Sequence, residues 1–195
     1  PDSKYYNKVY GKGGWKATTV ISLSIGQGEL GCTPLHLANL CATIANRGFY
    51  YTPHIIKDSE HVEIDPKYKE KNYTMVDTTH FPKVVGGMYR AVNSGFGSGG
   101  TASIAAVEGL EICGKTGTAQ NKGKDHSAFL GFAPRNNPKI AIAVYVENGG
   151  FGAEYGVPIG ALLMEKYING TLSEESEEKA RKIQKRSIYY GNEER

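Results

Sequence analysis

The chain has 195 residues, enough to bury the core of one globular domain. Hydrophobic residues make up 39% and charged residues 22% of it, a balance that excludes a disordered chain and a highly charged tail. The 23 basic and 20 acidic residues leave a net charge of +3, so we expect no nucleic-acid partner. No apolar run is long enough to cross a bilayer, and we therefore expect these residues to be soluble.

The first part of the chain is predicted to contain one helix. Residues 1–19 are polar and aperiodic, which predicts an irregular segment. Residues 20–25 form a β-rich run, which predicts a short strand. Thr33 and Pro34 then supply an N-cap and a first helical residue, and apolar residues at helical spacing continue this helix to Gly48.

The middle of the chain is predicted to contain loops around a second helix. Residues 50–57 are expected to be extended, and the charged residues 58–79 to form a hairpin or a surface loop. Apolar residues at intervals of three and four predict an amphipathic helix over residues 80–93. The glycine-rich residues 94–101 fit either the border of a cleft or a plain connection, and a short helix is expected at 102–107.

The last part of the chain is predicted to contain three strands and two helices. The strand-like residues 110–119, 127–133 and 140–147 are separated by short, turn-rich segments, which favours antiparallel pairing in chain order. Residues 157–168 have the apolar spacing of a helix. In residues 171–186 glutamates precede lysines and arginines by four positions, the favourable order for ion pairs on a solvated helix.

Three cysteines, Cys32, Cys41 and Cys113, match no zinc-binding pattern and permit at most one disulfide. We interpret all three as small buried hydrophobic residues. The histidines show no ligand spacing either. The sequence therefore implies no metal and no cofactor.

Residues 109–116 match the phosphate-loop pattern G-x-x-x-x-G-K-[ST], which is typical of nucleotide-binding proteins. Such a loop needs exposed backbone amides between its glycines and a helix that begins at the lysine. Here the residues between Gly109 and Gly114 are strand-like, and those after Thr116 are a poor helix start. The composition disfavours a phosphate loop, although a nucleotide-binding protein stays an alternative.

The same lysine begins a second motif, Lys115-Thr116-Gly117-Thr118, which fits the edge of a sheet. A strand points alternate side chains to opposite faces, and Gly117 leaves room for a peptide to pair with the backbone. Lys115 and Thr118 would then hold a carboxylate. This is the geometry that the K-T-G element of β-lactamases and penicillin-binding proteins requires.

The surrounding sequence strongly resembles the transpeptidase domain of class B penicillin-binding proteins, most of all the elongation type called penicillin-binding protein 2. The resemblance runs from about Trp15 to Ile168. The residues that carry it stand in the family's order: Ser24–Glu29, Thr33–Leu35, Ala45–Gly48, Thr52–Pro53, Lys115–Gln120, Asp125–Phe129, Phe132–Pro134, Asn137–Ala141 and Val146–Gly152.

The resemblance implies a mixed α+β fold of the β-lactamase and transpeptidase kind, an antiparallel sheet flanked by helices. It implies that the whole protein is a D,D-transpeptidase on the outer, periplasmic face of the bacterial inner membrane. That enzyme would cross-link peptidoglycan stem peptides through a serine acyl-enzyme during cell elongation, and it would bind β-lactams. Its expected partners are stem peptides, β-lactams and membrane proteins of the elongation machinery.

The resemblance also assigns roles to the K-T-G element. Lys115 is expected to be catalytic, supplying positive charge and a proton link beside the nucleophilic serine. Thr116, Gly117 and Thr118 are expected to bind substrate, with the two hydroxyls holding its carboxylate. The backbone N–H of Thr118 is expected to be one of two oxyanion donors.

Two further elements of the family, S-x-x-K and S-x-N, are expected before K-T-G and have no convincing match there. Ser176–Lys179 fits the first by spelling, but it lies in the charged tail, and we interpret it as coincidence. We therefore expect an incomplete domain: residues 1–170 as the C-terminal portion of a transpeptidase domain and residues 171–195 as a charged helical tail. Such a piece is expected to be inactive and, with an exposed sheet edge, to self-associate.

Three other classes of protein stay open. A β-lactam hydrolase would need a deacylating acid, which we cannot locate in the sequence. A non-catalytic peptide-binding relative differs from a transpeptidase in whether the whole protein contains S-x-x-K. A nucleotide-binding protein would be recognised by nucleotide titration.

Overall fold

The computed structural model describes residues 2–56, 62–94 and 98–188. The chain divides into two units, Pro1–Thr33 and Pro34–Arg195, each of which is described by itself. The smaller unit contains two helices, and the larger one contains the sheet and the remaining helices.

The prediction that residues 1–19 are irregular is wrong for helix α1 (Ser3–Tyr10). Asp2 caps this helix, because its carboxylate accepts a backbone N–H of the first turn at 2.8 Å. The helix is further fixed by aromatic packing, since the buried Tyr6 ring stacks on Tyr10 at 6.1 Å and on Trp15 at 5.4 Å between centroids. Trp15 lies beyond the end of the helix, so a helical periodicity does not reveal its contact with Tyr6.

The strand predicted at residues 20–25 is also wrong, because helix α2 (Ala17–Ser24) occupies most of it. The β preference of such a run is worth only about 1 kcal/mol and depends on a neighbouring strand. The hydroxyl of Thr19 instead accepts the N–H of Lys16 at 3.4 Å, which satisfies a donor at the start of the helix.

The sheet of the larger unit confirms the three predicted antiparallel strands. They are β3 (Cys113–Ala119), β4 (His126–Ala133) and β5 (Ile140–Val146), in the order β3-β4-β5. The first strand begins later than predicted, because Gly109 and Glu111 have φ of 78° and 44° and bend the chain before Cys113.

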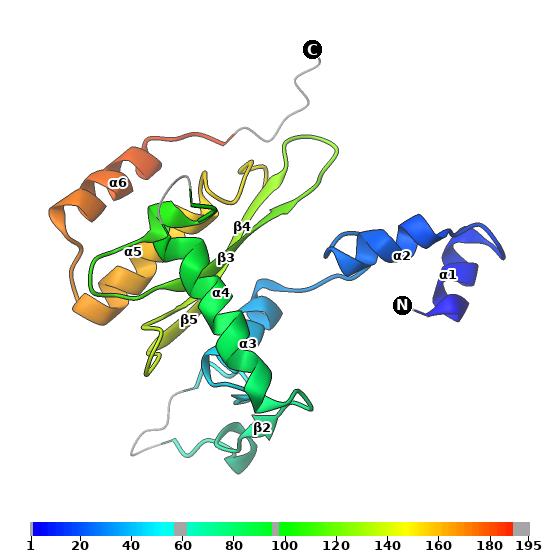
Figure 1. Ribbon diagram of the computed structural model, residues 1–195, viewed down its shortest axis with the longest axis horizontal. Coiled ribbons are helices and arrows are strands. Elements are labelled where there is room, and N and C mark those ends of the chain that lie inside the picture. Colours follow the sequence, from blue (N-terminus) through cyan, green and yellow to red (C-terminus); the bar gives the residue numbers. More distant parts are fainter. Residues whose placement is uncertain (1, 57–61, 95–97, 189–195) are drawn as a thin grey trace. The chain divides into compact units, whose positions relative to one another are not determined.

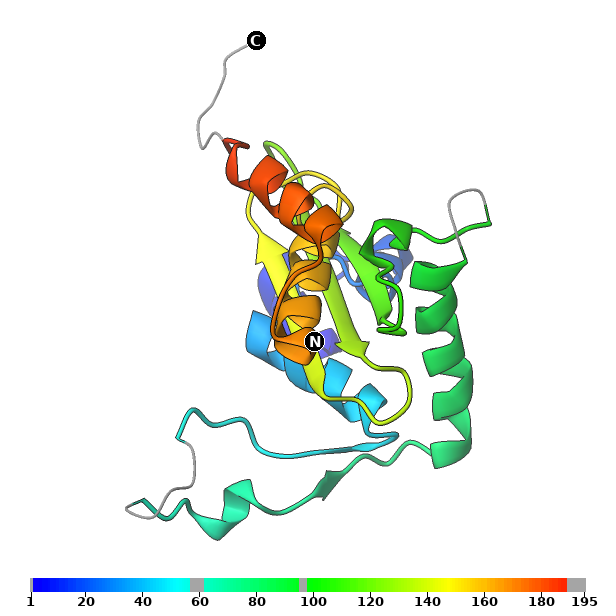
Figure 2. The ribbon, with the colours of Figure 1, turned by 90° about the vertical axis from the view of Figure 1, so that its left-hand side faces the viewer.

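Helices cover both faces of this sheet (Figures 1 and 2). Helices α3 (Pro34–Ala45), α4 (Phe81–Asn93) and α5 (Gly156–Asn169) confirm the helices predicted from apolar spacing. The first two lie on one face of the sheet and α5 lies on the other. Each face has its own buried cluster. Cys113 and Phe132 pack with α3 and α4. Phe129 packs with α5.

A protruding arm connects α3 to α4 (Figure 2). Its two-residue strands β1 (Phe49–Tyr50) and β2 (Asn72–Tyr73) pair antiparallel, as expected of a hairpin. Two 3-10 turns, η1 (Pro66–Tyr68) and η2 (Thr78–His80), follow along the arm. Part of the predicted extended and hairpin segments, residues 57–61, lies outside the described residues.

The cysteine prediction is correct for Cys41 and Cys113, which are buried, and wrong for Cys32, which is exposed. Cys32 lies in the connection between α2 and α3, where the neighbouring side chains from Gly31 to His36 are exposed as well. The short helix predicted at 102–107 is a 3-10 turn, η3 (Ser103–Ala105).

Helix α6 (Glu174–Gln184) confirms the predicted charged helix. It carries the three predicted ion pairs, Glu175–Lys179 at 2.8 Å, Glu177–Arg181 at 3.7 Å and Glu178–Lys182 at 2.7 Å. Its first turn is held to α5 by a buried carboxylate.

That carboxylate is Glu165, which is only 1% exposed and accepts the N–H of Ser173 at 2.8 Å. Burial raises the pKa of Glu165, but hydrogen bonds from Ser176 and Ser173 and the charge of Lys179 outweigh it, so the net pKa lies below 4.5. Ser176 is itself buried here, which supports the interpretation that its S-x-x-K spelling is coincidental.

We predict that Glu165→Gln lowers the free energy of unfolding by about 1.5–3 kcal/mol at pH 7, because the variant loses a hydrogen bond to a buried charge. Since folding lowers the pKa of Glu165, its contribution is present above the ordinary value of 4.5 and is lost as pH falls through the folded value. Urea unfolding at several pH values measures this difference. Glu108→Gln, at an exposed position, is the control and should change little; an equal effect in both variants would contradict the prediction.

A second prediction concerns the ring of Phe129, which fills the space that glycines leave between β3 and α5. A Cβ on Gly160 would lie 2.5 Å from this ring, and a Cβ on Gly114 would also lie 2.5 Å from it. We expect Gly160→Ala to destabilise the protein by about 1–3 kcal/mol, because the ring has no direction in which to yield. The free-energy cost of overpacking should therefore exceed the gain of about 1 kcal/mol that alanine brings to a helix.

Gly87 on α4 provides the matched control, since a Cβ there meets nothing within 4 Å. Gly87→Ala should stabilise the protein by about 0.5–1 kcal/mol through helix propensity alone. Thermal unfolding followed by circular dichroism compares the two variants. If both raised the melting temperature, the packing of Phe129 would not be as tight as we describe.

Candidate active site

The K-T-G residues lie on β3, which is an edge strand of the sheet among the described residues. One edge of β3 pairs with β4, where Thr116 is opposite Phe129 and Gly117 is opposite Ala128. No other described strand pairs with β3, so its second edge is available to an added strand. Lys115 is exposed on this strand, and Thr116 to Thr118 are half-buried.

This placement contradicts the phosphate-loop alternative. Lys115 is the third residue of a seven-residue strand, and the chain stays extended to Ala119. A phosphate loop requires a helix beginning at the lysine, whose N-terminus holds the phosphates. The backbone groups of this segment that face β4 instead belong to a sheet ladder.

Strand alternation divides the four K-T-G side-chain positions between two faces. Cys113 packs toward α3 and α4, and Lys115 and Gly117 share its face. Thr116 and Thr118 share the opposite face, which α5 covers. Two hydroxyls and a lysine ammonium therefore approach the open edge from different sides.

Two hydrogen bonds order the exposed part of the motif. Nζ of Lys115 donates to the carbonyl oxygen of Thr116 at 2.8 Å, which holds the ammonium close to its own strand. The hydroxyls of Thr116 and Thr101 are 3.4 Å apart. The segment before β3 is thereby brought to the strand at the K-T-G position.

A pocket of about 400 Å³ lies between α4 and β3, next to Lys115. We call it the α4–β3 pocket. Its lining consists of Gly87, Arg90, Ala91, Ser94, Ser98, Gly99, Thr101 and Lys115. The described ends of the glycine-rich segment thus border a cleft, one of the two roles expected for residues 94–101; residues 95–97 of that segment lie outside the description.

On the α5 side, a loop after β5 approaches the motif closely. A Cβ on Gly152 would lie 2.8 Å from the carbonyl oxygen of Gly117, so only a glycine fits this contact. The buried Ser127 holds the loop, because its hydroxyl donates to the carbonyl of Phe151 at 2.8 Å and accepts the N–H of Gly156 at 3.0 Å. Both residues lie in segments that carry the family resemblance, Asp125–Phe129 and Val146–Gly152, but the sequence assigned neither of them a role.

His126 is the first residue of β4, and Asp125 directly precedes the strand. Nδ1 of His126 accepts the N–H of Asn148 at 2.9 Å, and the carboxylate of Asp125 accepts the N–H of Asn121 at 3.3 Å. Both side chains therefore hold backbone groups of adjoining turns. Their role is structural at the end of the sheet.

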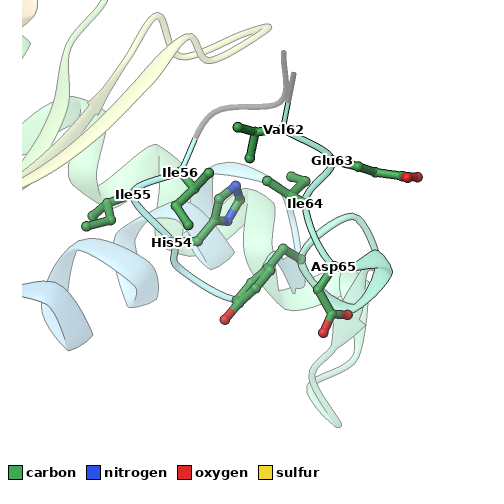
Figure 3. A pocket seen from close by; sticks show the side chains of 8 residues that line it. His54, Ile55, Ile56, Val62, Glu63, Ile64 and Asp65 are labelled. Carbon is green, nitrogen blue, oxygen red and sulfur yellow. The ribbon is translucent and has the colours of Figure 1, made fainter. Parts of the chain in front are cut away.

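A second cavity, of about 320 Å³, lies on the arm (Figure 3). Ile55, Ile56, Val62 and Ile64 line it together with His54, whose ring packs on Tyr68 at 4.9 Å between centroids. Asp65, which also borders it, accepts the N–H of Lys67 at 3.0 Å and so caps a turn. Figure 3 shows Glu63 pointing away from the other labelled side chains. Most of this lining is apolar, and it contains no serine or cysteine that could act as the nucleophile of acyl transfer.

Neither a metal cluster nor a membrane-spanning helix is found in the described part of the chain. No three His, Cys, Asp or Glu side chains of residues 2–56, 62–94 and 98–188 are placed to share a metal ion. Over the same residues, no helix has the length and apolar character needed to cross a bilayer.

Comparison with known proteins identifies the class to which this fold and edge strand belong. The family model described as "Penicillin binding protein transpeptidase domain" matches residues 5–165. The chain therefore belongs to the penicillin-binding protein transpeptidase family.

Within that family the chain is of the penicillin-binding protein 2 type. The peptidoglycan D,D-transpeptidase MrdA of Haemophilus influenzae is 31% identical, over 88% of this chain and 29% of the relative. MrdA of Acinetobacter baumannii is 36% identical, over 72% of this chain and 23% of the relative. The chain thus spans less than a third of the length of these curated relatives.

Solved structures of the same type share the fold. Penicillin-binding protein 2 of Pseudomonas aeruginosa, in complex with WCK 5153, matches with a TM-score of 0.69 and 34% identity, covering 90% of this chain and 38% of that one. The Helicobacter pylori protein matches with a TM-score of 0.70 and 26% identity, covering 88% and 31%. Mixed helices around an antiparallel sheet were expected from the sequence, and these structures confirm that fold class.

Proposed function

We propose that this chain supplies the substrate-binding strand of a peptidoglycan D,D-transpeptidase that cross-links stem peptides during cell elongation. The observation that carries the proposal is the open edge of β3, which presents Lys115 to Thr118 for pairing with a peptide. The names of the D,D-transpeptidase relatives support the reaction class.

In the proposed reaction a serine hydroxyl attacks the carbonyl of the penultimate D-alanine, and the terminal D-alanine leaves as the peptide bond breaks. Lys115 supplies positive charge and a proton link beside that serine. The hydroxyls of Thr116 and Thr118 bind the terminal carboxylate, and the N–H of Thr118 donates to the developing oxyanion. Gly117 gives the peptide backbone close access to the strand. An amine of a second stem peptide then takes the acyl group.

The nucleophile of this reaction is not among these residues. Within the 195 residues no Ser-x-x-Lys stands before Lys115, and the single match to that spelling is the buried Ser176 in the charged segment. We propose that residues 1–170 form the C-terminal part of a transpeptidase domain and that residues 171–195 form a helical tail. A longer protein containing S-x-x-K and S-x-N would complete the site.

The relatives also suggest where such a protein would work. A solved complex joins penicillin-binding protein 2 of Helicobacter pylori to MreC. We propose that the protein carrying this chain acts on the periplasmic face of the inner membrane with a comparable partner of the elongation machinery. Solved acyl-enzymes of the Mycobacterium tuberculosis relative with imipenem and penicillin G support β-lactams as ligands of the complete site.

Peptide binding tests the proposed strand directly. We predict that N-acetyl-L-lysyl-D-alanyl-D-alanine shifts the amide resonances of residues 115–119 in an NMR titration. The Thr118→Val variant should bind about tenfold more weakly or worse, because a hydrogen bond to a carboxylate is worth about 1.5–3 kcal/mol. Thr171→Val, at an exposed position beyond α5, is the matched control. Equal affinity of the Thr118→Val variant and the unchanged chain would count against the proposal.

Acylation provides the complementary test. We predict that a chain of these 195 residues is not labelled by a fluorescent penicillin, because acyl transfer needs an activated serine that it lacks. Gel fluorescence, with a complete penicillin-binding protein 2 as positive control, measures labelling. A covalent band on this chain would show that one of its own serines is the nucleophile, which would contradict our assignment.

A further inference from the structure

The end of the charged tail contacts the loop between β5 and α5. Residues 147–155 form this loop, which we call the β5–α5 loop. Nη1 of Arg186 donates to the carbonyl oxygen of Glu154 at 2.8 Å, and the guanidinium lies over the ring of Tyr155, 5.5 Å from its centroid. Tyr155 is buried. One arginine therefore joins the tail to two successive residues of the loop.

Arg186 differs from other basic residues of the tail in its partners. Lys179, Arg181 and Lys182 each pair with a glutamate four positions earlier on their own helix. Arg186 lies beyond the end of α6, where its N–H donates to the carbonyl of Ile183 at 3.0 Å and closes the last turn. Its guanidinium contacts a neutral carbonyl and an aromatic ring instead of a glutamate. The ion pairs that are typical of a solvated helix therefore do not explain this contact.

The start of the tail is held separately. The buried carboxylate of Glu165 on α5 accepts the N–H of Ser173 at 2.8 Å, at the N-cap of α6. The 11-residue helix then connects this contact to Arg186. Because α6 is already placed by its first turn, less conformational entropy is lost when Arg186 contacts the loop. An arginine that is itself exposed can therefore hold the loop.

The β5–α5 loop in turn contacts the K-T-G strand, on the face that carries the hydroxyls of Thr116 and Thr118. A Cβ on Gly152 would lie 2.8 Å from the carbonyl oxygen of Gly117 and 3.1 Å from Cβ of Thr116. The carbonyl of Gly152 also accepts the N–H of Val157 at 2.9 Å, which joins this contact to the first turn of α5. Movement of the loop would therefore change the surroundings of these hydroxyls.

Glu154 closes the turn that carries Gly152. One carboxylate oxygen of Glu154 accepts the N–H of Phe151 at 2.9 Å, and the other lies 3.7 Å from Nζ of Lys124. The N–H of Glu154 donates to the carbonyl of Phe151, also at 2.9 Å. Gly152 lies within this closed turn, and Arg186 contacts the turn through the carbonyl of Glu154. A displacement of Glu154 would therefore displace Gly152 as well.

We propose that Arg186 is a positioning residue for substrate binding. It holds the β5–α5 loop so that Gly152 stays against Gly117, beside the hydroxyls that bind the terminal carboxylate of the peptide. The inference rests on the proposed function, and it gives the charged tail a part in that function. When a ligand requires the closed loop, its apparent affinity falls in proportion to the closed fraction.

Amide hydrogen exchange of the intact chain measures how often the loop opens. The N–H of Val157 reports it, because its acceptor is the carbonyl of Gly152. We expect Arg186→Ala to speed exchange at Val157 about threefold, since the loop loses an exposed hydrogen bond and a cation–π contact. Arg186→Lys should restore part of the protection, because an ammonium can make both contacts. Lys185→Ala is the control: it removes the same charge from the neighbouring exposed position and should leave the exchange unchanged.

Peptide binding separates positioning from a purely structural role. In an NMR titration with N-acetyl-L-lysyl-D-alanyl-D-alanine, we expect Arg186→Ala to bind about twofold more weakly and Lys185→Ala to bind as the unchanged chain does. Equal affinity of Arg186→Ala and the unchanged chain, or equal exchange at Val157, would overturn the inference and leave the proposed function standing.

If the unchanged chain does not bind the peptide, the proposed function fails for this chain. Exchange at Val157 then decides whether Arg186 holds the loop: faster exchange in Arg186→Ala supports this contact, and equal exchange overturns it.

Discussion

The position of β3 depends on one packing arrangement, in which the ring of Phe129 lies between Gly114 of the sheet and Gly160 of α5. The ring leaves no space for a side chain on Gly114 of β3 or on Gly160 of α5, each of which would place a Cβ 2.5 Å from it. Phe129 is also the register partner of Thr116. The residue that packs between the sheet and α5 is therefore also paired with the K-T-G strand.

The two edges of β3 differ in whether another described strand pairs with them. The edge toward β4 satisfies the backbone groups of one side, and the other edge carries groups that an incoming peptide would pair. Gly152 contacts the strand from the α5 side, where a Cβ on Gly152 would lie 2.8 Å from the carbonyl oxygen of Gly117. The α4 side instead contains the α4–β3 pocket. The surroundings of K-T-G are thus closely packed on one face and open on the other.

Much of this arrangement could be predicted from local sequence patterns, and the rest could not be predicted in this way. The helices α3, α4 and α5 and the three strands were predictable, because one face of each is buried and its periodicity shows this. Helices α1 and α2 were missed because an Asp2 cap, stacked rings and a Thr19 hydroxyl decide them, against a weak propensity. The exposure of Cys32 was missed for a related reason, since burial depends on packing between elements distant in the sequence.

Side chains alternate between the two faces of a strand, which separates the ammonium of Lys115 from the hydroxyls of Thr116 and Thr118. Adjacent side chains point to opposite faces, so a hydroxyl pair and an ammonium cannot crowd the same atom of a ligand. The hydroxyls of Thr116 and Thr118 suit a group held flat against the strand edge, where backbone pairing sets the distance. Lys115 lies on the opposite face, where it borders the α4–β3 pocket. A hydroxyl pair on one face and an ammonium on the other therefore keep a fixed spacing, because the backbone of β3 sets the position of all three.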